Sequence, residues 1–446
     1  MKVGAKSIKL TDSESTLFSA PWPFHRKIMD TLREPSPKQH IEMVMVRYIL
    51  KILLHFLIIK STITELTKQP EETMPPIQLL IKPASGNCNM RCKYCFYYDE
   101  MQKRETASYG FMSLDTLEIM VRKVLEYADK ECTFAFQGGE PSLVGLDFYR
   151  SLMDFQKKYN TKHVKISNAI QTNGYALTEE WADFLARNHF LVGLSLDGIK
   201  YTHDAYRLDA VQKGTFGAVM KTAQLFDEKK VEYNILTVVN RRTAERISRI
   251  YDFYKKNHWQ YQQYIACLDP LGEIPGKREY SLTPEIYGDF LVQLFDLWYL
   301  DLQKGQQPYI RMFENYISIL MGYEPEACDQ RGSCSIQYVV EADGSVYPCD
   351  FYVLNEYKMG NFRENSIEEM TQKGRELKFV EASLAKPDEC STCPYLFLCR
   401  GGCRRNREQA ENGSLGSNYF CPSYKKFFKA ALPRMEQIAA WMRYGR

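Results

Sequence analysis

Three cysteines lie close together in the stretch GNCNMRCKYCFYY, where Cys88, Cys92 and Cys95 are spaced C-x3-C-x2-C. A structural zinc site takes four ligands, and a disulfide would leave one of the three thiols over. A four-iron cluster held by three thiolates leaves one iron without a protein ligand. That iron can accept a small molecule with two donor groups, such as the amino and carboxylate groups of an amino acid. An open iron–sulfur site is favoured over a degenerate zinc finger, because the loop follows the first strand of a barrel-like pattern.

A second group of cysteines lies near the C-terminus, where eight of the 13 follow residue 327. They are Cys328, Cys334, Cys349, Cys390, Cys393, Cys399, Cys403 and Cys421. Eight thiols make two complete sets of four, and no secretory signal is recognisable, so metal ligation is favoured over disulfides. Zinc and iron–sulfur clusters both use four thiolates, so the spacing leaves both open. Of the two remaining cysteines, Cys132 is predicted to be a buried apolar residue. Cys267 is predicted to pack rather than to line a pocket.

Short apolar runs alternate with amphipathic helical patterns from Ile77 onward. The predicted strands are 77–83, 132–138, 164–172, 191–197, 231–239 and 261–268, and helical patterns such as 114–130 and 178–188 lie between them. Six such units predict an α/β fold, a partial (β/α)6 TIM-like barrel with helices outside a parallel sheet. In such barrels chemistry gathers at the C-terminal ends of the strands. The first cysteine group follows the first predicted strand, at that end.

The chain changes character after the barrel pattern. Residues 280–323 are predicted to be helical, and a cysteine-rich domain is predicted over 324–446. Within that domain, two alternating runs over 336–352 surround Asp343-Gly344 and predict a β-hairpin. The chain is predicted to close with a helix over 423–442. The body of the protein is thus expected to divide into 74–323 and 324–446.

Residues 1–73 form an extension whose role the sequence leaves open. Its apolar stretch over 47–60 is interrupted by Arg47, Lys51 and His55, which are four residues apart and share one side of a helix. Its uncharged run is too short to span a bilayer. Three interpretations remain: a helix docked on the body, a membrane-surface helix, or an extension that precedes a start at Met74. The net charge of +3 argues against nucleic acid or an anionic membrane as a partner.

The first cysteine group, with Tyr94 before its last cysteine, resembles the signature of the radical S-adenosylmethionine enzymes. The Gly138-Gly139-Glu140-Pro141 turn after the second predicted strand resembles the GGEP motif of the same superfamily. The resemblance implies that Cys88, Cys92 and Cys95 bind a [4Fe–4S] cluster whose fourth iron is chelated by S-adenosylmethionine. It also implies that this cofactor is cleaved to methionine and a 5′-deoxyadenosyl radical, and that the GGEP backbone binds the methionine amino group.

From about Pro75 to the C-terminus, the chain is similar to the anaerobic sulfatase-maturating enzymes, especially the clostridial, cysteine-type ones. The resemblance rests on LLIKPAS, FAFQGGEP, QTNG, FLVGLSLDG, CLDPL and DGSVYPCDFYVL. It implies a C-terminal SPASM domain with two auxiliary [4Fe–4S] clusters. One is held by Cys328, Cys334, Cys349 and Cys403, and the other by Cys390, Cys393, Cys399 and Cys421. Residues 1–73 fall outside the resemblance and are the main departure from it.

The resemblance also implies roles for single residues. Those expected to contact the cofactor are Tyr94, Gly139, Ser195, Arg207 and Leu268. Asp350, in YPCDFY, is expected to accept a proton from the substrate. Tyr97 and Gln137 are expected to help hold the substrate.

The implied reaction is oxidation of a cysteine, or alternatively a serine, of an unfolded sulfatase to Cα-formylglycine. The expected partners are a sulfatase polypeptide with a C/S-x-P/A-x-R motif and a flavodoxin- or ferredoxin-type reductant. A monomer in the cytoplasm is expected, without nucleic acid or membrane partners. Two other functions remain open: a maturase of the same superfamily that forms thioether or carbon–carbon crosslinks in a peptide, and a non-catalytic iron–sulfur or zinc scaffold that transfers electrons.

Overall fold

The structure is a computed structural model, and it describes residues 76–408 and 414–444. The interpretations of the extension 1–73, including its apolar stretch over 47–60, lie outside the described residues. Within the described ranges, no helix is both long enough and apolar enough to cross a bilayer.

Six parallel strands form the body of the protein and lie side by side in chain order. They are β1 (Ile77–Ile81), β2 (Glu131–Phe136), β3 (Lys165–Thr172), β4 (Leu191–Ser195), β5 (Tyr233–Val239) and β6 (Tyr261–Ala266). Each overlaps a predicted strand. The residues on the face that the outer helices cover are almost wholly buried, for example Phe134 and Phe136. Apolar runs of this kind suit a parallel sheet because helices cover its outer face. The predicted barrel is confirmed.

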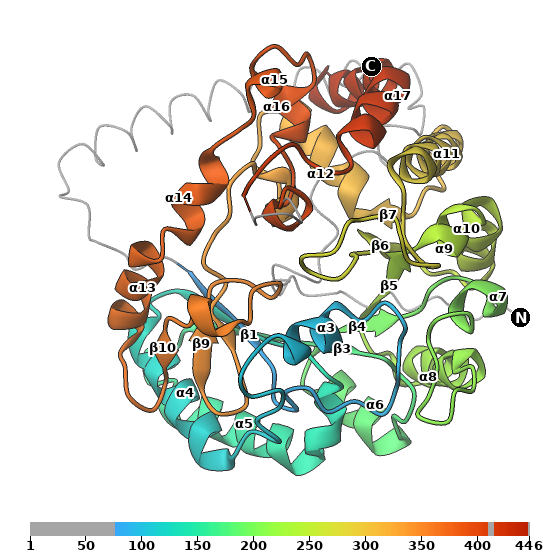
Figure 1. Cartoon of the computed structure of the whole chain (residues 1–446). Coiled ribbons are helices and arrows are strands. Elements are labelled where there is room, and N and C mark those ends of the chain that lie inside the picture. The colour runs from blue at the N-terminus through green and yellow to red at the C-terminus, as the bar shows by residue number, and fades with distance from the viewer. Residues whose placement is uncertain (1–75, 409–413, 445–446) are drawn as a thin grey trace, which may run out of the picture.

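Helices follow the strands and lie outside the sheet, as Figure 1 shows for α4, α5, α6, α8 and α10. The larger ones are α3 (Phe96–Gln102), α4 (Leu114–Tyr127), α5 (Leu146–Tyr159), α6 (Glu179–Arg187), α8 (Phe216–Lys229), α10 (Ile247–Lys256), α11 (Pro284–Leu302) and α12 (Arg311–Leu320). Two short helices, α7 (Lys200–His203) and α9 (Arg241–Ala244), follow β4 and β5. Several begin at side-chain caps, because Ser113 and Thr178 accept the backbone N–H three residues ahead and so satisfy a free donor.

The C-terminal segment joins the barrel sheet. The predicted hairpin is present as β8 (Val339–Val340) and β9 (Ser345–Tyr347), and Gly344 in its turn has φ +89°. A further short strand, β10 (Gly360–Asn361), pairs with β9. Strand β8 pairs in parallel with β1, so the hairpin extends the sheet past the first barrel strand. At the opposite edge a two-residue strand, β7 (Tyr309–Ile310), pairs with β6 where the sequence predicted helix.

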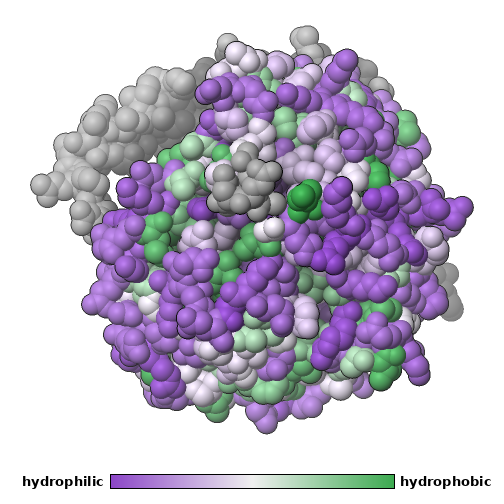
Figure 2. All heavy atoms as spheres, in the orientation of Figure 1, coloured by the Kyte–Doolittle hydropathy of each residue, from purple (hydrophilic) through white to green (hydrophobic). Residues whose placement is uncertain are grey.

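The remaining helices are α13 (Ile367–Glu376), α14 (Phe379–Leu384), α15 (Asp388–Ser391), α16 (Leu396–Cys399) and α17 (Cys421–Tyr444). Helix α17 is the predicted closing helix, and it packs on α11 and α12 through the rings of Phe427, Phe295 and Phe313. The same packing is visible at the top of Figure 1, where α17 lies near α11 and α12. The face shown in Figure 2 is mainly hydrophilic, with its apolar residues in small separate groups.

Candidate functional site

The first cysteine group lies in the loop that leaves β1, and Cys95 occupies the position directly before α3. Burial raises the pKa of the Cys88 thiol to about 11, and the Glu140 carboxylate and the nearby Cys95 add to this. Burial likewise raises the pKa of the Cys92 thiol to about 12, with Cys95 and Cys88 adding, while Arg207 lowers it. The three thiols are therefore close enough to influence one another.

The C-terminal thiols fall into two neighbourhoods. Burial raises the pKa of Cys349 well above its ordinary value, and Cys403 and Cys328 add to this; Cys334 in turn adds to the raised pKa of Cys403. A second set surrounds Cys399, whose pKa is raised first by burial and then by its three thiol neighbours. Those neighbours are Cys421, Cys390 and Cys393. These neighbourhoods contain the same cysteines as the two expected sets of four, and the assignment of those cysteines as cluster ligands stays a prediction.

This donor set fits iron–sulfur clusters. Among the described residues, no three His, Cys, Asp or Glu side chains form a group that could hold a metal ion directly. A four-iron cluster spaces its thiolate ligands more widely than a single ion does, because irons and sulfides lie between them. Eleven of the 13 cysteines fall in the three thiol groups. The other two, Cys132 and Cys267, are both buried, at 2% and 4% exposed.

The GGEP turn packs directly against the cysteine loop. Glu140 donates its backbone N–H to the carbonyl oxygen of Asn87 at 2.8 Å. Gly139 has φ +57°, and a Cβ there would lie 2.7 Å from the carbonyl oxygen of Ser85 and closer still to that of Asn87. The buried Glu140 carboxylate accepts the Asn173 N–H and the Thr172 hydroxyl, both at 2.8 Å, and so ties this turn to the end of β3. The turn therefore requires glycine, and it fixes the loop's position.

Asp197, two residues beyond β4, organises the cofactor side of the site. It accepts a hydrogen bond from the Tyr94 hydroxyl, and its other oxygen accepts the Val238 N–H at 2.9 Å. Arg207 Nε lies 3.0 Å from its carboxylate, and the Arg207 guanidinium lies 5.6 Å from the centre of the Tyr94 ring. Two residues expected to contact the cofactor, Tyr94 and Arg207, are thus held by one buried acid. A third, Ser195, is buried at the end of β4.

Asp350 lies where the C-terminal segment meets the barrel. Its Oδ1 accepts a hydrogen bond from Lys82 Nζ at 2.5 Å, and its Oδ2 accepts one from Gln137 Nε2 at 2.6 Å. The Lys82 ammonium also lies 3.9 Å from the centre of the Tyr97 ring. The structure therefore brings the expected base Asp350 together with Gln137 and Tyr97, the two expected substrate contacts.

The Tyr97 hydroxyl already has protein partners. It donates to Glu341 Oε1, and Arg104 Nη2 donates to it at 3.3 Å. The same glutamate pairs with Arg104 Nη1 at 2.8 Å, and both side chains are fully buried. Burial, followed by the Glu341 carboxylate, raises the pKa of Tyr97 well above its ordinary range. The ring of Tyr97, rather than its hydroxyl, is therefore the part that faces the Asp350 site.

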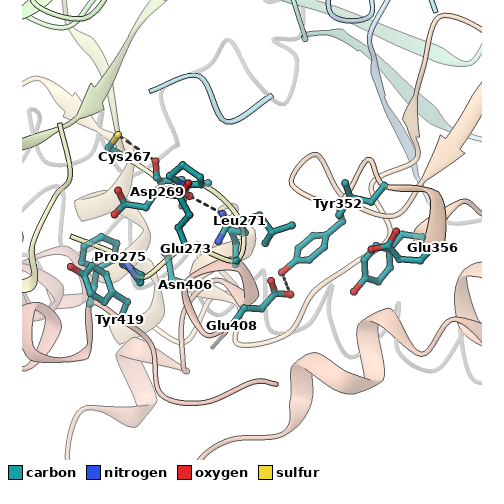
Figure 3. Close-up of a pocket in the computed structure, with 17 residues that line it drawn as sticks. Cys267, Asp269, Leu271, Glu273, Pro275, Tyr352, Glu356, Asn406, Glu408 and Tyr419 are labelled. Atoms are coloured by element: carbon teal, nitrogen blue, oxygen red, sulfur yellow. Dashed lines mark hydrogen bonds between the residues drawn. The ribbon is translucent and has the colours of Figure 1, made fainter. Parts of the chain in front are cut away.

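A cavity of about 240 Å³ opens between the loop after β6 and the C-terminal segment. Figure 3 shows Cys267, Asp269 and Leu271 on one side and Tyr352 and Glu356 on the other. Leu268 is part of its lining, and so is Cys267, which was expected only to pack. The loop is held from both sides: the Leu271 N–H donates to Asp99 of α3 at 2.8 Å, and Arg405 donates to the carbonyl of Asp269 at 2.8 Å.

Sequence reasoning missed several residues of the site, above all Lys82, Asp197 and Glu341. A lysine after a strand is ordinarily solvent-exposed, whereas the Lys82 side chain is 0% exposed. Asp197 lies in the strand end SLDG, whose position at the C-terminal edge of the sheet was the available signal. Glu341 lies in the hairpin, and nothing local in the sequence pointed to Tyr97 and Arg104 as its partners.

Comparison with protein families finds two matches. Residues 83–254 match the model of the radical SAM superfamily, and residues 328–394 match that of an iron–sulfur cluster-binding domain, SPASM. The chain is 47% identical over 371 residues to a cysteine-type anaerobic sulfatase-maturating enzyme of Clostridium novyi, covering 83% of this chain and 99% of that protein. It is 32% identical over 379 residues to a serine-type anaerobic sulfatase-maturating enzyme of Bacteroides thetaiotaomicron, covering 81% of this chain and 91% of that protein.

Two solved structures share the fold of this chain. The structure matches anSMEcpe with bound AdoMet and Cp18Cys peptide at a TM-score of 0.78 and 46% identity, covering 82% of this chain and 99% of that one. It also shares its fold with SuiB of Streptococcus suis bound to the precursor peptide SuiA, at a TM-score of 0.55 and 17% identity. The identities with the Clostridium novyi and Bacteroides thetaiotaomicron enzymes hold over nearly the full lengths of those proteins. This chain therefore belongs to the anaerobic sulfatase-maturating enzymes of the radical SAM superfamily.

Proposed function

We propose that this protein oxidises a cysteine of an unfolded sulfatase to Cα-formylglycine. The observation that carries the proposal is the meeting of Asp350, Gln137 and Lys82 beside the cysteine loop, in a chain 47% identical to a cysteine-type sulfatase-maturating enzyme. The cysteine-type relatives are more similar to this chain than the serine-type ones, at 46–47% against 27–32% identity. Cysteine is therefore proposed as the preferred target and serine as the alternative.

The chain's own residues are proposed to bind the cluster and the cofactor, to orient the substrate and to accept a proton from it. Cys88, Cys92 and Cys95 hold one [4Fe–4S] cluster, while Tyr94, Gly139, Ser195, Arg207 and Leu268 bind S-adenosylmethionine. When bound, these groups would supply a 5′-deoxyadenosyl radical able to abstract a hydrogen atom from the substrate Cβ. Arg207 is already paired with Asp197, so a bound cofactor carboxylate would share the Arg207 charge with that acid. The C-terminal cysteines hold two auxiliary clusters in the sets described above.

The substrate radical then loses one proton and one electron, and the electron would pass to the auxiliary clusters held by the C-terminal cysteines. Asp350 accepts the proton from the substrate thiol, which leaves a thioaldehyde. Water then replaces the sulfur, which leaves as hydrogen sulfide, to give the aldehyde of formylglycine. Gln137 and the ring of Tyr97 border the place where the thiol must lie. Such a site works by holding reacting groups about 3–3.5 Å apart and excluding water until oxidation is complete.

The proposal extends to organisation and partners. Residues 74–323 form the barrel unit and 324–446 the SPASM unit, with 1–73 as an extension. The protein acts as a monomer in the cytoplasm, on a sulfatase segment with a C/S-x-P/A-x-R motif, and takes electrons from a flavodoxin- or ferredoxin-type protein. The related anSMEcpe has been solved with AdoMet and a Cp18Cys peptide bound, which supports the choice of a peptide substrate.

Anaerobic incubation of the reconstituted protein with C-x-P-x-R and S-x-P-x-R peptides tests the function. Mass spectrometry should find formylglycine in the cysteine peptide, in step with 5′-deoxyadenosine. A peptide that loses two hydrogens but keeps its sulfur would instead indicate a crosslinking maturase. Absence of 5′-deoxyadenosine from protein with full cluster content would indicate a scaffold or electron carrier.

A further inference from the structure

Lys82 is a fully buried charge at the boundary between the barrel and the C-terminal segment. It follows β1 directly, and its side chain is 0% exposed. Moving an ammonium group out of water is strongly unfavourable unless a partner compensates for the lost hydration. The carboxylate that compensates Lys82 is Asp350, which lies 268 residues further along the chain.

The room for Lys82 comes from the glycine turn. A Cβ on Gly138 would lie 2.6 Å from Lys82 Cγ and 2.9 Å from its Nζ. Gly138 also has φ +111°, which disfavours any residue with a side chain. The first glycine of the GGEP turn thus opens the path along which the lysine stem reaches Asp350.

The Asp350 carboxylate is held at both oxygens, because Lys82 binds Oδ1 and Gln137 binds Oδ2. Two donors on different oxygens fix the plane of the carboxylate as well as its position. The Lys82 ammonium is in turn held over the Tyr97 ring at 3.9 Å. Glu100 is a further acid near this pair: burial and then Asp350 raise the pKa of Glu100 well above its ordinary range, whereas Lys82 lowers it.

We propose that Lys82 is a positioning residue for the reaction: it holds the Asp350 carboxylate in the orientation that accepts the substrate proton, in the space that Gly138 leaves open. The inference rests on the proposed role of Asp350. Lys82 acts through Asp350 and does not take part in cofactor cleavage. Loss of Lys82 should therefore lower formylglycine formation without lowering hydrogen abstraction.

The test compares Lys82→Met with wild-type protein, both reconstituted anaerobically. Cluster content and 5′-deoxyadenosine formation should stay near wild type, while formylglycine per 5′-deoxyadenosine should fall by about 10²-fold, the cost of a misplaced catalytic group. KM for the peptide should change little, since Lys82 is covered by protein. Lys82→Arg should restore part of the yield. A crystal structure of Lys82→Met should show the Asp350 carboxylate moved away from Gln137.

Two further variants test whether Lys82 acts through Asp350. Gly138→Ala leaves the charge in place but obstructs the lysine stem, and should lower the same ratio. In the Asp350→Asn background, Lys82→Met should cause no additional loss, because residues that act through one another are not additive. Lys255→Met, which breaks an ion pair of 2.5 Å with Asp301 away from the site, is the control for general destabilisation.

An unchanged product ratio in Lys82→Met would overturn the inference, and so would a full additional loss in the Asp350→Asn background. Loss of cluster iron in Lys82→Met, with Gly138→Ala unaffected, would overturn it as well, because Lys82 would then support the fold alone. Wild-type protein that cleaves its cofactor but makes no formylglycine from either peptide would instead contradict the proposed function.

Discussion

Gln137 and Asp350 meet at 2.6 Å, although 213 residues separate them in the chain. Gln137 directly follows β2, and Asp350 follows a cysteine assigned to an auxiliary cluster. The contact is possible because β8 pairs with β1, which in turn pairs with β2, so that the hairpin brings Asp350 to the C-terminal edge of the barrel. The proposed base is therefore supplied by the C-terminal segment and oriented by residues at the ends of the barrel strands.

Asp350→Asn should leave cofactor cleavage intact but prevent most formation of formylglycine. The substitution keeps size and most hydrogen-bonding capacity but removes the proton acceptor. 5′-Deoxyadenosine should still form, and deuterium on the substrate Cβ should still reach it, because hydrogen abstraction comes before proton loss. Formylglycine should fall by about 10²–10⁴-fold, the usual contribution of a general base. Near-normal formylglycine would make Asp350 a structural turn residue.

Asp329→Asn is a matched control for that variant. Asp329 directly follows Cys328, just as Asp350 follows Cys349, and the two cysteines are assigned to the same cluster. Lys82 and Gln137 bind the carboxylate of Asp350 and not that of Asp329. It should keep both cluster content and formylglycine yield. If both variants lose iron together, the effect of Asp350→Asn reports only support of the neighbouring cysteine.

Removal of the first cysteine group should remove one cluster and all cofactor cleavage. Wild-type protein reconstituted anaerobically is expected to hold three four-iron clusters, because eleven of the 13 cysteines fall in three groups. Cys88, Cys92 and Cys95 replaced together by Ala should lower the iron content by about one third, since only one of the three sites is lost. Iron and sulfide analysis with a cleavage assay checks this, and surviving cleavage would disprove the assignment.

Much of the fold could be predicted because the barrel strands are short, β-rich runs that alternate with amphipathic helical patterns. All six barrel strands were predicted to within a few residues on that ground. Strand β7 was missed because Tyr309–Ile310 is too short to show any period, and it directly precedes an amphipathic helix. The pairing of β8 with β1 joins residues about 260 apart, and no local pattern encodes it.

The site was predictable where residue type and spacing carry chemistry, as with the cysteines. It was not predictable where a residue's role depends on a distant partner. Lys82 shows this: most lysines are exposed, and only the fold reveals that Asp350 and the Tyr97 ring surround it. Asp197 could have been suspected from its strand end, but its bonds to Tyr94 and Arg207 come from separate loops.

Gly139→Ala should weaken cofactor binding by moving the GGEP turn away from the cysteine loop. An added Cβ would clash with the carbonyl oxygens of Asn87 and Ser85, and a left-handed backbone costs roughly 1–2 kcal/mol for alanine. Gly110→Ala is the control, because Gly110 has φ +76° but no atom within 4 Å of an added Cβ. Equilibrium dialysis with S-adenosylmethionine should show weaker binding only for Gly139→Ala. Equal losses would attribute the effect to backbone strain alone.

A chain that starts at Met74 should fold, hold its clusters and turn over. The first barrel strand begins at Ile77, and its pairings are with β2 and β8. The Clostridium novyi relative is covered over 99% of its length by 83% of this chain, so a catalytic unit of that size is complete in the relative. Soluble yield, iron content and formylglycine formation compare the two lengths. Loss of cluster content in the shorter chain would show that residues 1–73 complete the core.

The buried acid Glu314 on α12 should make the protein less stable at alkaline pH. Glu314 is 4% exposed, and its Oε1 has no hydrogen-bond partner among the described residues. Burial, with Glu326 adding, raises its pKa from 4.5 to about 8. An acid whose pKa is higher in the folded state binds more protons when folded, so it lowers stability as pH rises from its unfolded pKa toward its folded one. The penalty is complete above pH 8. Because each tenfold difference in proton affinity between the two states corresponds to ~1.4 kcal/mol, the penalty amounts to a few kcal/mol at most.

Glu314→Gln should therefore stabilise the protein at alkaline pH and have little effect at acidic pH, since Gln carries no charge at any pH. Its Tm, followed by calorimetry from about pH 5.5 to 9, should exceed that of wild type by roughly a few degrees at the alkaline end and converge with it toward the acidic end. Glu228→Gln, at an exposed position on α8, should leave Tm unchanged throughout. A difference that is the same at every pH would show that packing, and not ionisation of Glu314, sets the effect.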